Sequence, residues 1–107
     1  MNSIVNMAEY EREVINADTP VLVDFYADWC DPCMKFAPVL ESVSEKMNMS
    51  VKFVKINVDH APDLAKNHFI DIIPSILLFK NGKLLDRMKD VMREEEVLGW
   101  IKKTIAV

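Results

Sequence analysis

The chain has 107 residues, of which half are apolar and 28% are charged, and its net charge is −4. This length and composition predict that residues 1–107 form one folded domain around one core. No block of basic residues is present, and no apolar stretch near the N-terminus has the length of a signal peptide or a membrane span. We therefore expect no nucleic-acid or membrane partner and, by default, a cytoplasmic location.

The first part of the chain predicts an edge strand, a helix and a central strand. Residues 2–5 are a short candidate strand, and residues 7–14 then place apolar side chains at helical spacing. After a turn signal at residues 18–20, residues 21–26 are apolar on both faces, which is typical of a central parallel strand. Asp24 is the one charged residue in that run.

A long amphipathic helix is predicted from Cys33 onward, with this cysteine in its first turn. Its apolar residues repeat at helical spacing and are Phe36, Val39, Leu40, Val43 and Met47. Pro38 lies inside the predicted helix. An interior proline costs about 3 kcal/mol and bends the axis, so we expect a kink there. The alternative is a helix that begins only at Pro38.

The second part of the chain continues with strands. Residues 51–58 are rich in β-branched side chains and predict a second central strand, and a short helix follows near residues 63–68. Residues 75–80 form a third apolar run. The dipeptide Asn81-Gly82 favours a tight hairpin turn, after which residues 84–88 return antiparallel.

A last helix is predicted to begin at the acidic residues 94–96, because negative charge suits the positive end of a helix dipole. Its apolar face is formed by Val97, Leu98, Ile101 and Ile105. Strands joined by helical crossovers, followed by a hairpin and a closing helix, predict an α/β fold. We expect a mixed central sheet of four to five strands with helices on both faces.

Cys30 and Cys33 are the only cysteines, and they stand at a strand-to-helix junction. Two thiols at this spacing can close a small disulfide ring, which indicates redox chemistry. Only a thiolate attacks a disulfide, and a helix N-terminus stabilises its negative charge. We therefore assign Cys30, just before the helix, as the nucleophile and Cys33 as the more shielded resolving thiol.

A structural zinc site is the alternative use of the two cysteines. It would need two further ligands, and His60 and His68 are the only histidines in the chain. Their spacing does not match that of a zinc finger, so we expect no metal and interpret both as loop or helix-surface residues. The seven methionines are scattered and indicate no cofactor site.

Several stretches of the chain share a pattern with one known family. They are residues 23–30, the helix proline Pro38, residues 54–59, Ile73-Pro74-Ser75 and residues 79–82. Together with the run Trp29-Cys30-Asp31-Pro32-Cys33 they resemble the thioredoxin family along essentially the whole chain. This resemblance implies a thioredoxin fold, thiol-disulfide exchange and the same order of attack by the two cysteines.

Asp24 is expected to act on the resolving cysteine. An unpaired carboxylate in a buried strand is costly and has a raised pKa, and strand alternation places Asp24 on one sheet face with Leu22 and Tyr26. The resemblance implies that it serves as general base for Cys33 through a water, with Lys55 as its charge partner. The structural alternative is a satisfied Asp–Lys pair.

Pro74 stands where the thioredoxin family has a cis proline that faces the cysteines. Ile73 would then offer its backbone to an extended substrate, a mode of recognition largely indifferent to side chains. Trp29, Ile72 and Ile73 would form an apolar rim, although plain packing is an alternative role for Trp29. The expected substrate-binding residues are Trp29, Asp31, Pro32, Ile72, Ile73, Pro74 and Asp90.

Two positions depart from the family pattern. Asp31 stands where the family usually has glycine, and its charge should raise the pKa of Cys30 and make the couple more reducing. Attraction between Asp31 and the helix dipole opposes this effect. Asp90 stands where the family groove has a glycine that lets substrate backbone approach, and we expect weaker action on acidic substrates.

The sequence thus predicts a monomeric protein-disulfide reductase that binds no cofactor and carries a redox-active Cys30–Cys33 disulfide. The resemblance implies recycling by an NADPH-dependent flavoprotein, a thioredoxin reductase. A disulfide oxidase or isomerase with the same fold is one alternative. A binding or scaffold module in which the cysteines are incidental is the other.

Overall fold

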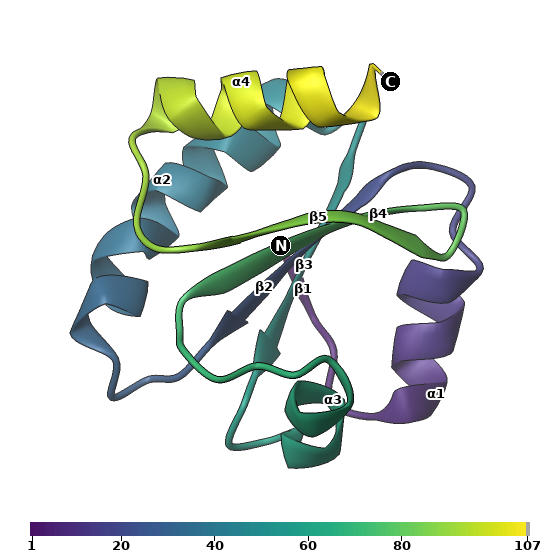
Figure 1. Cartoon of the computed structure of the whole chain (residues 1–107), viewed down its shortest axis with the longest axis vertical. Helices are drawn as coiled ribbons and strands as arrows, with labels where there is room; N and C mark the ends of the chain where they lie inside the picture. The colour runs from purple at the N-terminus through teal and green to yellow at the C-terminus, as the bar shows by residue number, and fades with distance from the viewer. Residues whose placement is uncertain (107) are drawn as a thin grey trace.

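The molecule is built on a five-stranded sheet with the strand order β1-β3-β2-β4-β5. The computed structural model describes residues 1–106. The strands are β1 (Asn2–Ser3), β2 (Val21–Tyr26), β3 (Lys52–Asn57), β4 (Ser75–Lys80) and β5 (Lys83–Lys89). The helices are α1 (Met7–Tyr10), the π-helical segment η1 (Glu11–Ile15), α2 (Asp31–Met47), α3 (Pro62–Asn67) and α4 (Glu94–Ile105) (Figure 1).

The sheet is mixed, as predicted. β1 and β2 both pair with β3 in parallel, whereas β4 pairs antiparallel with β2 and with β5. β2 is therefore the central strand, and its residue Asp24 lies between Lys55 of β3 and Ile76 of β4. The predicted α/β fold with helices on both faces is confirmed.

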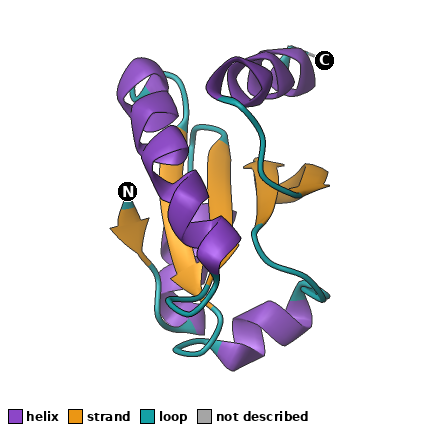
Figure 2. Ribbon diagram, turned by 90° about the vertical axis from the view of Figure 1, so that its left-hand side faces the viewer, coloured by secondary structure: helices purple, strands orange, loops and turns teal. Residues whose placement is uncertain are grey.

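Each face of the sheet is covered by its own helices. Alternation along β2 sends Leu22 to a core with α2 and α4, and sends Val23 and Phe25 to a core with α1, η1 and α3. α2 and α4 lie side by side on the first face (Figures 1 and 2). Asp24 has the same parity as Leu22, so its side chain points under α2.

α2 is one continuous helix that contains Pro38, and the alternative of a helix that begins at Pro38 is wrong. Cys30 is its N-cap: the backbone there is extended, and its sulfur accepts from the Cys33 N–H. Pro32 fits the first turn because the N–H that proline lacks has no helical partner at that position. The helix therefore begins directly after the first cysteine and carries the second.

Two predicted elements differ in extent. The edge strand ends at Ser3, and the first helix changes at Glu11 from α-helical to π-helical hydrogen bonding. Tyr10 and Val14, four residues apart, lie on the same helix face and are both buried in the core. Across residues 1–106, no helix has the length and hydropathy needed to cross a membrane.

Candidate active site at the Cys30–Cys33 disulfide

The two cysteines form a disulfide at the junction between β2 and α2. The backbone N–H of Cys33 donates to the Cys30 sulfur at 3.2 Å. Because this N–H belongs to the first turn of α2, the helix dipole adds to the same positive potential. Both groups favour a negative charge on Cys30 when the disulfide is reduced, which suits a nucleophilic thiolate.

Exposure does not distinguish the two cysteines, since Cys30 is 5% and Cys33 is 4% exposed. The expectation that Cys33 is the more shielded thiol therefore stays a prediction. The two sulfurs differ in what they face. Cys30 lies 3.8 Å from the carbonyl oxygen of Ile73, on the outer side, whereas Cys33 lines a cavity on the inner side.

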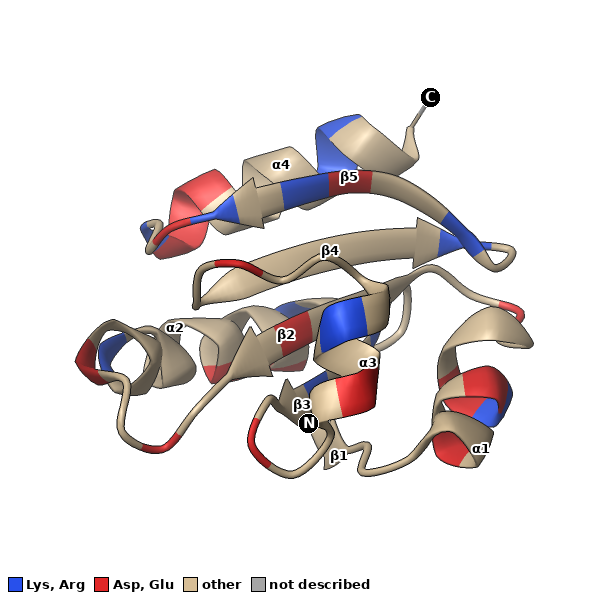
Figure 3. Ribbon diagram, turned by 60° about the horizontal axis from the view of Figure 1, so that its bottom comes forward, with Lys and Arg blue, Asp and Glu red and all other residues tan. Residues whose placement is uncertain are grey.

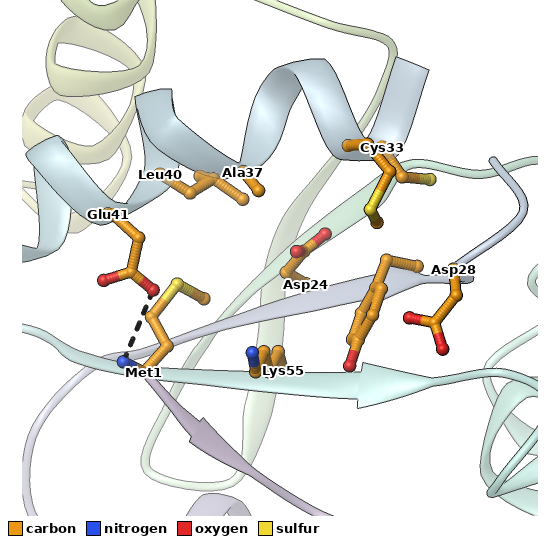
Figure 4. A pocket seen from close by; sticks show the side chains of 10 residues that line it. Met1, Asp24, Asp28, Cys33, Ala37, Leu40, Glu41 and Lys55 are labelled. Atoms are coloured by element: carbon orange, nitrogen blue, oxygen red, sulfur yellow. Dashed lines mark ion pairs between the residues drawn. The ribbon is translucent and has the colours of Figure 1, made fainter. Parts of the chain in front are cut away.

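The inner cavity has a volume of about 200 Å³, which is room for several water molecules. Figure 4 shows Asp24 from β2 and Cys33 from α2 facing it together. Its lining residues are Met1, Asp24, Tyr26, Asp28, Cys33, Met34, Ala37, Leu40, Glu41 and Lys55. The cavity thus brings Cys33 together with a buried carboxyl group, as the sequence predicted.

Asp24 is 8% exposed, and its Oδ1 has no hydrogen-bond partner among residues 1–106. Burial raises the pKa of Asp24 from its ordinary value near 3.8 to about 7, although the positive charge of Lys55 opposes the rise. A carboxyl group with this pKa exchanges protons at neutral pH. That is the property a general base requires.

Lys55 faces Asp24 across the parallel β2–β3 pair but makes no ion pair with it in the described part of the chain. Its Nζ lies 5.7 Å above the ring centroid of Tyr26. A satisfied Asp–Lys pair, the structural alternative, is therefore contradicted. Lys55 acts on Asp24 through its charge across the cavity.

The outer side of the disulfide is an apolar groove formed by loop residues and the ends of strands. It is lined by Trp29, Val58, Ala65, Ile70, Asp71, Ile72 and Ile73. The Ile73–Pro74 peptide bond is cis. The groove thus brings together all three members of the predicted rim.

Trp29 is 70% exposed, so core packing is not its role. Its indole N–H donates to Asp59 Oδ2 at 2.8 Å, which fixes the ring beside the groove. Asp59 was not among the predicted site residues. The only sequence signal for it is its place directly after the second central strand, at the end of the sheet where Cys30 also lies.

The three remaining predicted residues are exposed. Asp31 and Pro32 form the first turn of α2, next to Cys30. Asp90 follows β5, and the pairing of Ser75 with Lys89 puts it beside Pro74. Its φ of 156° lies in the region that favours glycine, and its Oδ1 accepts from the Val91 N–H at 2.7 Å.

The histidines do not extend the site. His60 is exposed in a loop, as expected, but the surface placement expected for His68 is wrong. The His68 Nε2 lies 2.6 Å from the Tyr10 hydroxyl and its Nδ1 lies 2.7 Å from the Leu64 carbonyl oxygen. Nδ1–H donates to that carbonyl, and Nε2 accepts from Tyr10.

Among residues 1–106, no group of three or more His, Cys, Asp or Glu side chains is placed to hold a metal ion. The disulfide lies between the inner cavity and the outer groove, with Cys33 lining the cavity and Cys30 next to Ile73 of the groove.

Comparison with known proteins matches the thioredoxin family model to residues 2–103. The chain belongs to the thioredoxin family. A thioredoxin of Rickettsia felis is 37% identical over 105 residues, covering 98% of this chain and all of the relative. A thioredoxin of Porphyra purpurea is 38% identical over 104 residues, covering 97% of each chain. Thioredoxin Y2 of Arabidopsis thaliana, named chloroplastic, is 40% identical over 92 residues, which cover 86% of this chain and 55% of that protein.

As a thioredoxin, the chain is a thiol-disulfide oxidoreductase with a redox-active Cys30–Cys33 disulfide. The geometry adds cavity residues that sequence patterns did not indicate, namely Asp28, Met34 and Glu41. Asp28 and Met34 lie within a few residues of the cysteines, whereas Glu41 lies about two turns of α2 after Cys33. Only the structure brings Glu41 to the same space.

Proposed function

We propose that this thioredoxin is a protein-disulfide reductase in which Cys30 attacks and Cys33 resolves. The Cys30 thiolate attacks one sulfur of a substrate disulfide, forming a mixed disulfide and releasing the first substrate thiolate. The Cys33 thiolate then attacks the Cys30 sulfur, restores the Cys30–Cys33 disulfide and releases the second. The substrate gains two electrons and the enzyme dithiol loses them.

One observation carries this assignment of roles: the two sulfurs face different sides of the site. Cys30 faces the groove through which a protein substrate could reach it, 3.8 Å from the Ile73 carbonyl. Cys33 faces the cavity that holds Asp24. Asp24 accepts the Cys33 proton through a water in that cavity, with Lys55 stabilising the carboxylate that must form beforehand.

Substrates are held by backbone pairing with Ile73 next to Pro74. Trp29, Ile72 and Ile73 provide the apolar contacts on either side, and Asp31, Pro32 and Asp90 border the path of the substrate. Main-chain recognition is largely independent of substrate sequence, which suits a reductase of many proteins.

The oxidised form has to be recycled by a donor of two electrons. We assign this role to an NADPH-dependent thioredoxin reductase. We place the protein in the cytoplasm, as a monomer in which residues 1–107 form a single domain. The proposal is supported by the family resemblance and by the net charge of −4, which disfavours binding to nucleic acid or to an anionic membrane.

Reduction of insulin disulfides with dithiothreitol as the electron source tests the function. The parent is expected to accelerate precipitation of the insulin chains, and Cys30→Ser to abolish the acceleration. Cys33→Ser should form a stable mixed disulfide with insulin that mass spectrometry detects. Activity that survives Cys30→Ser would contradict the proposal, and so would an adduct formed by Cys30→Ser in place of Cys33→Ser.

A further inference from the structure

Phe69 adopts a backbone conformation that a bulky side chain rarely occupies. Its φ is 55°, in the left-handed region, and its side chain is 80% exposed. Left-handed residues are usually glycine, and for a bulky residue the conformation is an outlier. An aromatic ring in solvent gains nothing from the core to offset that strain.

The backbone around Phe69 is fixed by hydrogen bonds. The N–H of Phe69 donates to the Lys66 carbonyl at 3.1 Å, and the N–H of Ile70 donates to the Ala65 carbonyl at 3.0 Å. This pair of bonds is the Schellman motif that ends α3, in which the left-handed position is commonly glycine. Arg87 of β5 also donates to the His68 carbonyl, at 3.1 Å. The ring of Phe69 is thus held outside the core by a rigid loop end.

The loop that presents Phe69 continues directly into the outer groove. Ile70, Asp71 and Ile72 line that groove opposite Trp29. Trp29 and Ile72, which line the groove, are 70% and 55% exposed, and Phe69 directly precedes the lining residue Ile70, so three large apolar side chains are exposed in the groove or next to it in the chain. We call Trp29, Phe69 and Ile72 the apolar triad.

In the described part of the chain, three exposed carboxylates near the groove lack a positive partner, whereas Lys66 of α3, three residues before Phe69, is an exposed base. Asp31, Asp59 and Asp90 are exposed, and within residues 1–106 none of them forms an ion pair. Asp71 is neutralised by Lys89 at 2.8 Å. Figure 3 shows acidic residues on the loops that meet at the end of the sheet where α2 begins. Lys35, one turn into α2, is the nearest base on that helix.

Building on the proposed reductase function, we propose that Phe69 and this acidic rim select one class of substrate. The class is a protein segment that carries an apolar side chain and at least one Lys or Arg close to its disulfide. The apolar side chain covers Phe69 and Trp29, and the basic residue meets Asp31, Asp59 or Asp90. Complementary charge raises the association rate, and an aromatic anchor fixed in advance lowers the entropy lost on binding.

Phe69→Gly tests the aromatic anchor, because glycine keeps the left-handed backbone and removes only the ring. The assay compares two peptide disulfides that share a leucine and differ in a flanking Lys or Glu, together with the uncharged 2-hydroxyethyl disulfide. Phe69→Gly should lower kcat/KM for the Lys peptide by about fivefold and leave the rate for the small disulfide unchanged. Asn81→Gly is the matched control: Asn81 has a φ of 53° in the β4–β5 turn, away from the groove, so no rate should change.

The charge part is tested with the same peptides. The parent should prefer the Lys peptide by about tenfold at low ionic strength and less at high salt. The double variant Asp31→Asn/Asp90→Asn should have a smaller ratio of kcat/KM for the Lys peptide over the Glu peptide. Equal rates of the parent on both peptides, or equal rates of Phe69→Gly and the parent on the Lys peptide, would overturn the inference. A parent that reduces none of the three disulfides would instead overturn the proposed reductase function.

Discussion

The two sides of the Cys30–Cys33 disulfide contrast in construction. The inner side is made mainly by neighbouring strands and one helix, and it is a small cavity lined by the buried Asp24, whose Oδ1 has no hydrogen-bond partner among residues 1–106. The outer side is made by loop ends and is an exposed apolar groove beside carboxylates. In the proposed mechanism the inner side moves a proton and the outer side selects the substrate. The contrast implies that changes on one side leave the task of the other intact.

The largest effect is expected from Asp24→Asn on the inner side. Burial raises the pKa of Asp24 to about 7, so between its ordinary value and 7 the folded state binds more protons than the unfolded state. The free energy of unfolding must therefore fall as pH rises from about 4 to about 7, and then level off. The shift of the Asp24 pKa between the unfolded and the folded state corresponds to a fall of roughly 4 kcal/mol in the free energy of unfolding.

Denaturant unfolding across this pH range measures that effect. Asp24→Asn should be more stable than the parent above about pH 7, by up to the amount just given, and the difference should shrink as pH falls. Asp63→Asn, on exposed α3, is the control and should follow the parent. A difference between Asp24→Asn and the parent that does not vary with pH would mean that Asp24 is not a buried, titrating acid.

A smaller effect is expected from Asp90→Gly on the outer side. The φ of 156° at Asp90 favours glycine, so the substitution should stabilise the protein by about 1 kcal/mol. Asp90→Ala removes the same charge but keeps the Cβ atom, and it should give no such gain. Thermal unfolding compares the two variants, and equal stabilities would exclude backbone strain as the cause.

The smallest effect is expected from Asp31, which lies directly after Cys30 in the first turn of α2. Removing its charge in Asp31→Gly should lower the pKa of Cys30 in the reduced protein and make the couple less reducing, because a repulsive charge beside the thiolate is lost. Thiolate absorbance followed against pH measures this pKa. Asp31→Asn, which keeps the helix backbone, should act in the same direction, and a pKa that does not fall in either variant would refute the repulsion.

Local patterns were sufficient to predict that Asp24 and Cys33 meet on the inner side, although they did not indicate Glu41. The strands at residues 21–26 and 75–80 have the predicted bounds, because apolar runs ended by turn residues define buried strands clearly. Alternation along β2 was enough to place Asp24 under α2. The resemblance to thioredoxins added the roles of the cysteines, and those roles remain proposals.

The outer side could not be predicted in the same detail. Its key features depend on contacts between distant segments, such as the hydrogen bond from Trp29 to Asp59. The sequence did not indicate the left-handed conformation of Phe69, because such a helix end is predicted from glycine or asparagine and position 69 has neither. The contact of the half-buried His68 with Tyr10 joins residues that are 58 positions apart in the sequence.

The most direct test of the separation between the sides is the pH dependence of mixed-disulfide resolution. The rate at which the Cys30–Cys33 disulfide re-forms from a mixed disulfide with 2-hydroxyethanethiol is measured from about pH 5 to about pH 9 in the parent and in Asp24→Asn. We predict an inflection near the Asp24 pKa of about 7 in the parent. Asp24→Asn should lack this inflection and resolve about a hundredfold more slowly at neutral pH. Identical profiles in the two proteins would contradict the role of the inner cavity in proton transfer.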